Sequence, residues 1–86
     1  MDSVADLQAQ IIALRAAVEG AWLAMLRRDG DAHAQAERIG RESVEAIGQL
    51  DAKSADALAM RAAITHHTEQ LWGSIAWQLG QDEKTA

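Results

Sequence analysis

The sequence predicts an all-helical fold, and three observations support this class. The 86-residue chain contains no proline, the residue that disfavours helix most strongly. It is rich in alanine, leucine, glutamate, glutamine and arginine, which favour helix. Its apolar residues recur at spacings of three and four, the period of a helix with an apolar face. We expect a single domain over residues 1–86, a three-helix up-down-up bundle or a long helical hairpin, completed by dimerisation.

The first predicted helix covers residues 4–28. Ser3 precedes it and Asp6 follows three residues later, which resembles a capping box with aspartate in place of glutamate. Large apolar residues then follow a strict 3-4 spacing, a seven-residue repeat that is typical of helices packed at shallow angles. We call this row the heptad seam and expect it to build the core: Val4, Leu7, Ile11, Leu14, Val18, Ala21 and Met25.

The opposite side of this helix carries small residues, again at spacings of three and four. Such a stripe lets a second helix approach closely, although surface alanines that simply favour helix are an alternative explanation. Leu23 lies at the edge of the stripe and is hard to bury if only the seam makes contact. A helix with two apolar sides is expected inside a bundle or across a dimer interface. The predicted interface residues of this helix are Leu23, Ala9, Ala13, Ala16, Ala17, Gly20 and Ala24.

The second predicted helix covers residues 32–50. The sequence "RRDGD" ends the first helix, with Gly30 expected in the left-handed conformation and Asp31 as the cap of the second helix. Ala36, Gly40, Val44 and Gly48 form a row at spacings of four. Because glycine costs about 1 kcal/mol in a helix relative to alanine, we expect close packing there against a tryptophan, Trp22 or Trp72.

The third predicted helix covers residues 55–80, after a break at 51–54 where Asp51 or Ser54 is the expected cap. A continuous kinked helix through this break is the alternative. Gly80 is expected to end the helix, leaving residues 81–86 as a frayed tail. In an up-down-up bundle the first and third helices run parallel, which predicts that Trp22 and Trp72 lie in the same layer.

Trp77 is predicted to lie outside the apolar arc of the third helix, which is itself wide enough for more than one neighbour. It shares the outer face with Gly73, one turn earlier, over which its indole could lie. One explanation is an exposed tryptophan that covers its own helix. The other, which we favour, is an interface anchor, since aromatic residues are enriched where binding energy concentrates. Trp77 and Gly73 therefore join the predicted interface.

Composition argues against several classes of function. The net charge is −5, and the scattered basic residues lack the cationic footprint that direct binding to nucleic acid requires. No uninterrupted apolar run approaches about 18 residues, so no membrane span is expected. The absence of cysteine excludes disulfides and thiolate metal sites and is consistent with a cytoplasmic protein.

No catalytic, cofactor or metal site is expected either. His66 and Glu69 are three residues apart, but the apolar faces carry no matching acids to complete a metal site. The serines are not spaced for catalysis with His and Asp, and no glycine-rich phosphate loop is present. We therefore expect a protein that is not an enzyme and binds no metal and no cofactor.

The leading hypothesis is a helical protein-protein interaction module that forms a homodimer through the first and third helices and acts as an adaptor, regulator or assembly subunit. The first alternative is a small acidic inhibitor, of the phage anti-defence type, that occupies a basic groove on a nucleic-acid-binding protein. The second is a ligand-binding bundle, with a small apolar cavity beside Trp22 and Trp72. Acids clustered on one face would favour the inhibitor, and a filled tryptophan layer would exclude the cavity.

Overall fold

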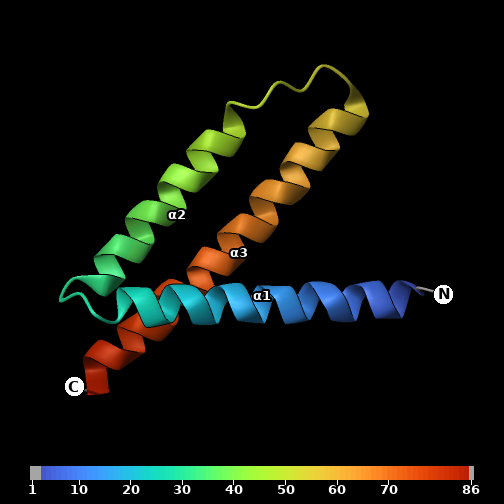
Figure 1. Ribbon diagram of the computed structural model, residues 1–86. Helices are drawn as coiled ribbons and strands as arrows, with labels where there is room; N and C mark the ends of the chain where they lie inside the picture. The colour runs from blue at the N-terminus through green and yellow to red at the C-terminus, as the bar shows by residue number, and fades with distance from the viewer. Residues whose placement is uncertain (1–2, 86) are drawn as a thin grey trace.

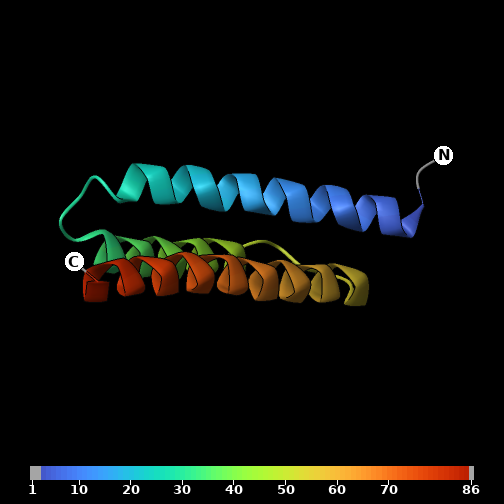
Figure 2. The same cartoon turned by 90° about the horizontal axis from the view of Figure 1, so that it is seen from below.

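The computed structural model describes residues 3–85, which form three α-helices. Helix α1 covers Val4–Leu26, α2 covers Ala32–Gly48 and α3 covers Ala55–Thr85. α2 and α3 lie antiparallel as a hairpin, and α1 crosses this hairpin obliquely (Figure 1). Seen from below, α1 occupies a layer of its own above the hairpin (Figure 2). The all-helical class is confirmed, and the non-helical residues between α2 and α3 exclude one continuous helix.

The starts of α1 and α3 are fixed by serine caps, as expected. The backbone N–H of Asp6 donates to Ser3 Oγ at 3.1 Å, and that of Ala57 donates to Ser54 Oγ at 3.1 Å. Asp31 stands at the cap position of α2 but makes no capping bond. Its carboxylate instead accepts a hydrogen bond of 2.8 Å from Gln35 Nε2.

The predicted left-handed conformation of Gly30 is wrong. No residue of the described chain has a positive φ, so the turn between α1 and α2 is built without the left-handed region. The helix ends also differ slightly from the prediction: α1 ends at Leu26 and α2 at Gly48, each two residues early. Differences of this size are ordinary at fraying helix ends.

The core lies where the end of α1 meets the hairpin. Trp22 of α1 packs edge-to-face on Trp72 of α3, with ring centroids 5.0 Å apart. This contact confirms that the two tryptophans share a layer. The buried residues come from all three helices: Leu23, Leu26, Ala32, Ala36, Trp72, Ile75 and Leu79.

Gly40 explains how α2 and α3 approach so closely. A Cβ atom placed on Gly40 would lie 2.9 Å from Trp72 Cβ, closer than real contacts allow. The expectation that a tryptophan packs against the glycine row of α2 is therefore confirmed at Gly40. At Gly48, the last member of the row, no atom lies within 4 Å of the added Cβ.

The carboxyl end of α3 is longer than predicted. The helix continues through Gly80 to Thr85, so the frayed tail is wrong for residues 81–85, while residue 86 lies outside the described residues. Gly80 faces His33 of α2, whose imidazole would contact an added Cβ at 3.4 Å. Two residues further along α3, Asp82 Oδ2 accepts a hydrogen bond of 2.7 Å from Arg27 Nε. These contacts tie the end of α3 to α2 and to the end of α1.

Candidate interaction surface

The heptad seam does not build the core, which corrects the main packing prediction for α1. Its large side chains are 42% exposed at Val18 to 74% exposed at Val4, and Ala21 is exposed as well. The buried residues of α1 are Leu23 and Leu26, and neither belongs to the seam. An apolar row that runs the full length of α1 is therefore left without a partner inside the described chain.

The reason is the direction in which α1 meets the hairpin. At about 100° per residue, the side of α1 that carries Trp22, Leu23 and Leu26 lies roughly 100° around the helix from the centre of the seam. Towards the amino end, this side carries two charged residues and, one turn before Arg15, the exposed Ile12. Arg15 and Glu19 lie on it, half-buried, and Arg15 Nε lies 3.7 Å from Glu19 Oε1. The hairpin thus covers an apolar surface only at the last two turns of α1.

The seam faces the half of the hairpin that α1 leaves uncovered. Trp22 follows Val18 by four residues and lies at the seam edge of the contact. It touches Trp72, which precedes the buried Ile75 on α3 and so lies nearer the α2–α3 connection. The part of the hairpin beyond this point extends away from α1 towards that connection (Figure 1).

Exposed apolar side chains continue over this uncovered part. On α3, Ile64 and Met60 precede the half-buried Leu71 by seven and eleven residues, which places all three on one side of the helix. Leu50 lies just beyond the end of α2, where its backbone carbonyl accepts a hydrogen bond of 2.9 Å from the Arg61 guanidinium of α3, and it is exposed. We call these exposed residues the open hairpin face: Leu50, Met60 and Ile64. Together with the heptad seam, they form the candidate interaction surface.

The predicted small-residue stripe lies on a third side of α1, and all six of its small residues are exposed. Leu23, which we predicted as part of the same interface, is buried in the core of the chain and is not available to a partner. Its burial follows from its position next to Trp22, on the side that meets the hairpin. The stripe Ala9, Ala13, Ala16, Ala17, Gly20 and Ala24 therefore stays a predicted contact surface, without Leu23.

Trp77 is 65% exposed, but it lies on a different surface from α1. It follows the buried Ile75 by two residues, or about 200° around α3, so it points away from the α1 layer. The indole does not lie over Gly73, because no atom lies within 4 Å of a Cβ added there. The structure therefore does not bring Trp77 and Gly73 together with the α1 stripe into one surface.

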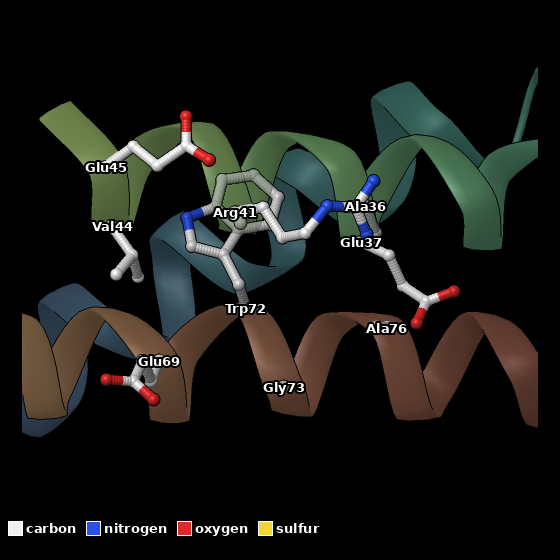
Figure 3. A pocket seen from close by; sticks show the side chains of 10 residues that line it. Ala36, Glu37, Arg41, Val44, Glu45, Glu69, Trp72, Gly73 and Ala76 are labelled. Carbon is white, nitrogen blue, oxygen red and sulfur yellow. The ribbon is translucent and has the colours of Figure 1, made fainter.

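The space between Trp22 and Trp72 is filled, because the two rings pack edge-to-face with centroids 5.0 Å apart. An open depression of about 600 Å³ does lie between α2 and α3, with Trp72 at its floor (Figure 3). Its rim carries Glu45, Glu69 and Arg41, among other side chains of the hairpin. This depression is a shallow, open surface and not an enclosed ligand site.

The histidines do not form a metal centre in the described chain. His66 and His67 pack against each other with ring centroids 5.4 Å apart, and His33 Nδ1 lies 3.5 Å from Glu37 Oε1. Across residues 3–85, no group of three or more His, Asp or Glu side chains could hold a metal ion.

One helix of the described residues, α1, also fits the length and composition of a membrane span. This 23-residue helix is long and apolar enough, by length and composition alone, to cross a membrane, and most of it is exposed. The sequence prediction considered only uninterrupted apolar runs. Asp6, Arg15 and Glu19 interrupt the run but leave the helix apolar on average. A lipid bilayer therefore competes with a protein partner as the surroundings of α1.

Comparisons with known proteins provide no relative: the chain matches no protein family model, and no curated protein or solved structure shows significant similarity to it. The geometry of α1 and the hairpin is therefore the basis on which a function is proposed.

Proposed function

We propose that this chain is a non-enzymatic helical interaction module that self-associates, with α1 and the adjoining face of α3 as its contact surface. Biologically, such a module acts as an adaptor, a regulator or an assembly subunit. The observation that carries the proposal is the exposed heptad seam of α1. A seven-residue repeat is the pattern of a helix that packs lengthwise on another helix, and α1 meets no such neighbour within the described chain.

The energetics of α1 support a partner. In proteins, most helical stability comes from the tertiary packing of an apolar face. Before Trp22, α1 has little such packing, although the helix extends back to Val4. Fully burying a Val, Leu or Ile side chain contributes about 1.5–3 kcal/mol. A second chain over the seam would stabilise both α1 helices by covering such side chains.

A protein partner is favoured over a bilayer by the charges of α1. Arg15 and Glu19 lie in the middle of the helix, where a charged residue costs about 2.5–3.5 kcal/mol in a membrane. In addition, Leu23 and Leu26 would have to leave the core for α1 to span a bilayer. A partner helix along the seam requires neither change, because the seam lies on another side of α1.

The acidic inhibitor is less well supported, because acids and bases are interleaved on the surface. Arg27 pairs with Asp82 and Lys53 with Asp51, each across an exposed contact. On α2, Arg38 and Arg41 are exposed among the exposed glutamates of the same helix. A mimic of a nucleic-acid backbone needs a surface of one sign, which this distribution does not supply.

Two neighbouring isoleucines provide a matched test of the proposal. Ile11 belongs to the seam and Ile12 does not, yet they are 64% and 68% exposed, so glutamate at either position should leave the protomer folded. We expect the wild-type chain to sediment as a dimer at low micromolar concentration. Ile11→Glu should shift it to the monomer, because a charge would be buried at the contact. Ile12→Glu should sediment like the wild type.

Circular dichroism at a dilution where the wild type is monomeric checks that both variants retain the helix content of the wild-type monomer. A wild-type chain that sediments as a monomer throughout a dilution series would overturn the proposal. If the two variants change the sedimentation of the chain equally, the contact between chains does not lie on the seam.

A further inference from the structure

The residue types of the seam indicate how many helices would pack together and in which direction. In the seven-residue repeat, the first core position, named a, is occupied by the β-branched Val4, Ile11 and Val18 and, in the last turn, by Met25. The second core position, named d, is occupied by Leu7 and Leu14 and then by Ala21. In parallel coiled coils, β-branched residues at a together with leucine at d favour two strands over three or four. From Val4 to Val18, the seam therefore has the core composition of a parallel two-stranded helix pair.

The length of the seam also favours a parallel pair. When two copies of α1 lie parallel and in register, every seam residue from Val4 to Met25 faces its own counterpart. An antiparallel pair that matches a positions with d positions omits a layer at one end, either Val4 or Met25. At a rise of about 1.5 Å per residue, the parallel pair makes continuous contact over roughly 30 Å.

The positions that flank the seam place no like charges against each other in the parallel arrangement. The flanking residues are Gln8, Gln10, Arg15, Ala17, Trp22 and Ala24. In a parallel pair, Gln10 of one helix faces Arg15 of the other, which is a neutral-to-charged contact. Arg15 is the only charged residue among them, and it has Glu19 beside it on its own helix.

We infer that the occupant of the seam is the α1 helix of a second copy, parallel and in register, so that two α1 helices form a central pair between two α2–α3 hairpins. The inference rests on the proposed self-association and adds its partner segment and direction. The hairpin meets α1 about 100° away from the seam and leaves room for the second helix. A two-fold axis along the pair places the hairpins on opposite sides.

The same arrangement accounts for the open hairpin face. The seam faces the uncovered half of the hairpin, so a helix laid along the seam also lies over Ile64 and Met60 of α3. By symmetry, the partner's hairpin approaches α1 from the side opposite to its own hairpin. That side carries Ala13, Ala17 and Ala24, which are small enough for close approach.

Cysteine cross-linking tests the direction of the pair, since the natural chain contains no cysteine. We would make Leu7→Cys and Val18→Cys separately in the full chain and oxidise each at a concentration where the wild type is dimeric. A parallel in-register pair brings each cysteine next to its own counterpart. Each variant alone should therefore shift from the 9.3 kDa band to a band of twice that mass, which a reductant reverses.

Ile12→Cys is the matched control, because it is equally exposed but lies off the seam, and it should not form the linked band. A dimeric chain in which Leu7→Cys and Val18→Cys cross-link only when mixed is antiparallel. That result would overturn this inference and leave the proposed self-association intact. A chain whose sedimentation stays monomeric at every concentration would overturn both.

Discussion

The two ends of α1 differ sharply although both are apolar. In the last two turns, Leu23 and Leu26 are buried against the hairpin and Trp22 packs on Trp72. Over the first turns, the seam residues Leu7 and Ile11 are exposed, and so is Ile12 on the side of α1 that continues from Leu23. The carboxyl end of α1 thus completes the protomer's own core. The amino end has the composition of a surface that packs lengthwise on another helix.

The geometry of the crossing explains why one helix carries both surfaces. Two helices that cross obliquely touch only near their crossing point, so α1 needs core residues only at its carboxyl end (Figure 1). A seven-residue repeat over the whole length is useful only to a neighbour that runs alongside. The hairpin does not supply such a neighbour, and the repeat of α1 therefore supports the proposed second copy.

The largest expected difference between the two ends is in stability. Ile75 is fully buried beneath the crossing, so Ile75→Ala should lower the free energy of unfolding by about 2–5 kcal/mol. Leu14→Ala, on the exposed seam, should cost less than 1 kcal/mol when measured on the monomer. Thermal unfolding at high dilution checks both. Equal losses would show that the seam is part of the protomer's own core.

The glycines of α2 should respond with opposite signs. Gly40→Ala places a methyl group against the backbone end of Trp72, and such overpacking costs about 1–3 kcal/mol, more than the helix propensity gained. Gly48→Ala meets open space and should stabilise the chain by up to about 1 kcal/mol. Midpoints of urea unfolding measure both shifts. Stabilisation by Gly40→Ala would contradict the close approach of α2 and α3.

A smaller effect is expected at the carboxyl end of α3. Asp82→Asn removes the ion pair with Arg27 that links this end to α1. Because both side chains are about half exposed, the loss should be less than about 1 kcal/mol and should shrink at high salt. Thermal unfolding at two ionic strengths measures it. A loss that does not depend on salt would indicate a role other than the exposed pair.

The smallest expected effect is at Trp77. From the sequence, this residue is a candidate anchor whose loss would weaken the dimer by about 1–2 kcal/mol. In the structure it points away from α1, so Trp77→Ala should leave the dissociation constant of an α1-centred dimer unchanged. Sedimentation equilibrium of the variant measures this dissociation constant. A tenfold or larger rise in the dissociation constant would place the contact on the outer face of α3.

Local features of the fold could be read from the sequence, whereas the partner of each apolar face could not. Ser3 and Ser54 cap their helices by accepting hydrogen bonds from backbone N–H groups only three residues away. The contact between Trp22 and Trp72 could be predicted from the relative direction of the first and third helices alone. Periodicity shows that a face is to be buried, without showing whether its own chain or another one buries it. A usable signal did exist in α1, because Arg15 and Glu19 lie on the same side as the buried residues of its last turns.

The sequence-based prediction of where α3 ends was wrong for a related reason. Gly80 is typical of a helix end, but here its missing side chain makes room for His33 of α2. The pair between Asp82 and Arg27 joins residues that are 55 positions apart in the sequence. Local sequence signals do not report such distant contacts, so the extension of α3 to Thr85 became visible only in three dimensions.

Residue-resolved amide hydrogen exchange along α1 tests the central claim most directly, because it compares the two ends of one helix in the same sample. We expect amides between Ile11 and Val18 to be protected at concentrations where the chain is dimeric. On dilution to the monomer they should lose this protection, while Leu26 stays protected by the core. Rapid exchange between Ile11 and Val18 at every concentration would show that no second copy covers the seam.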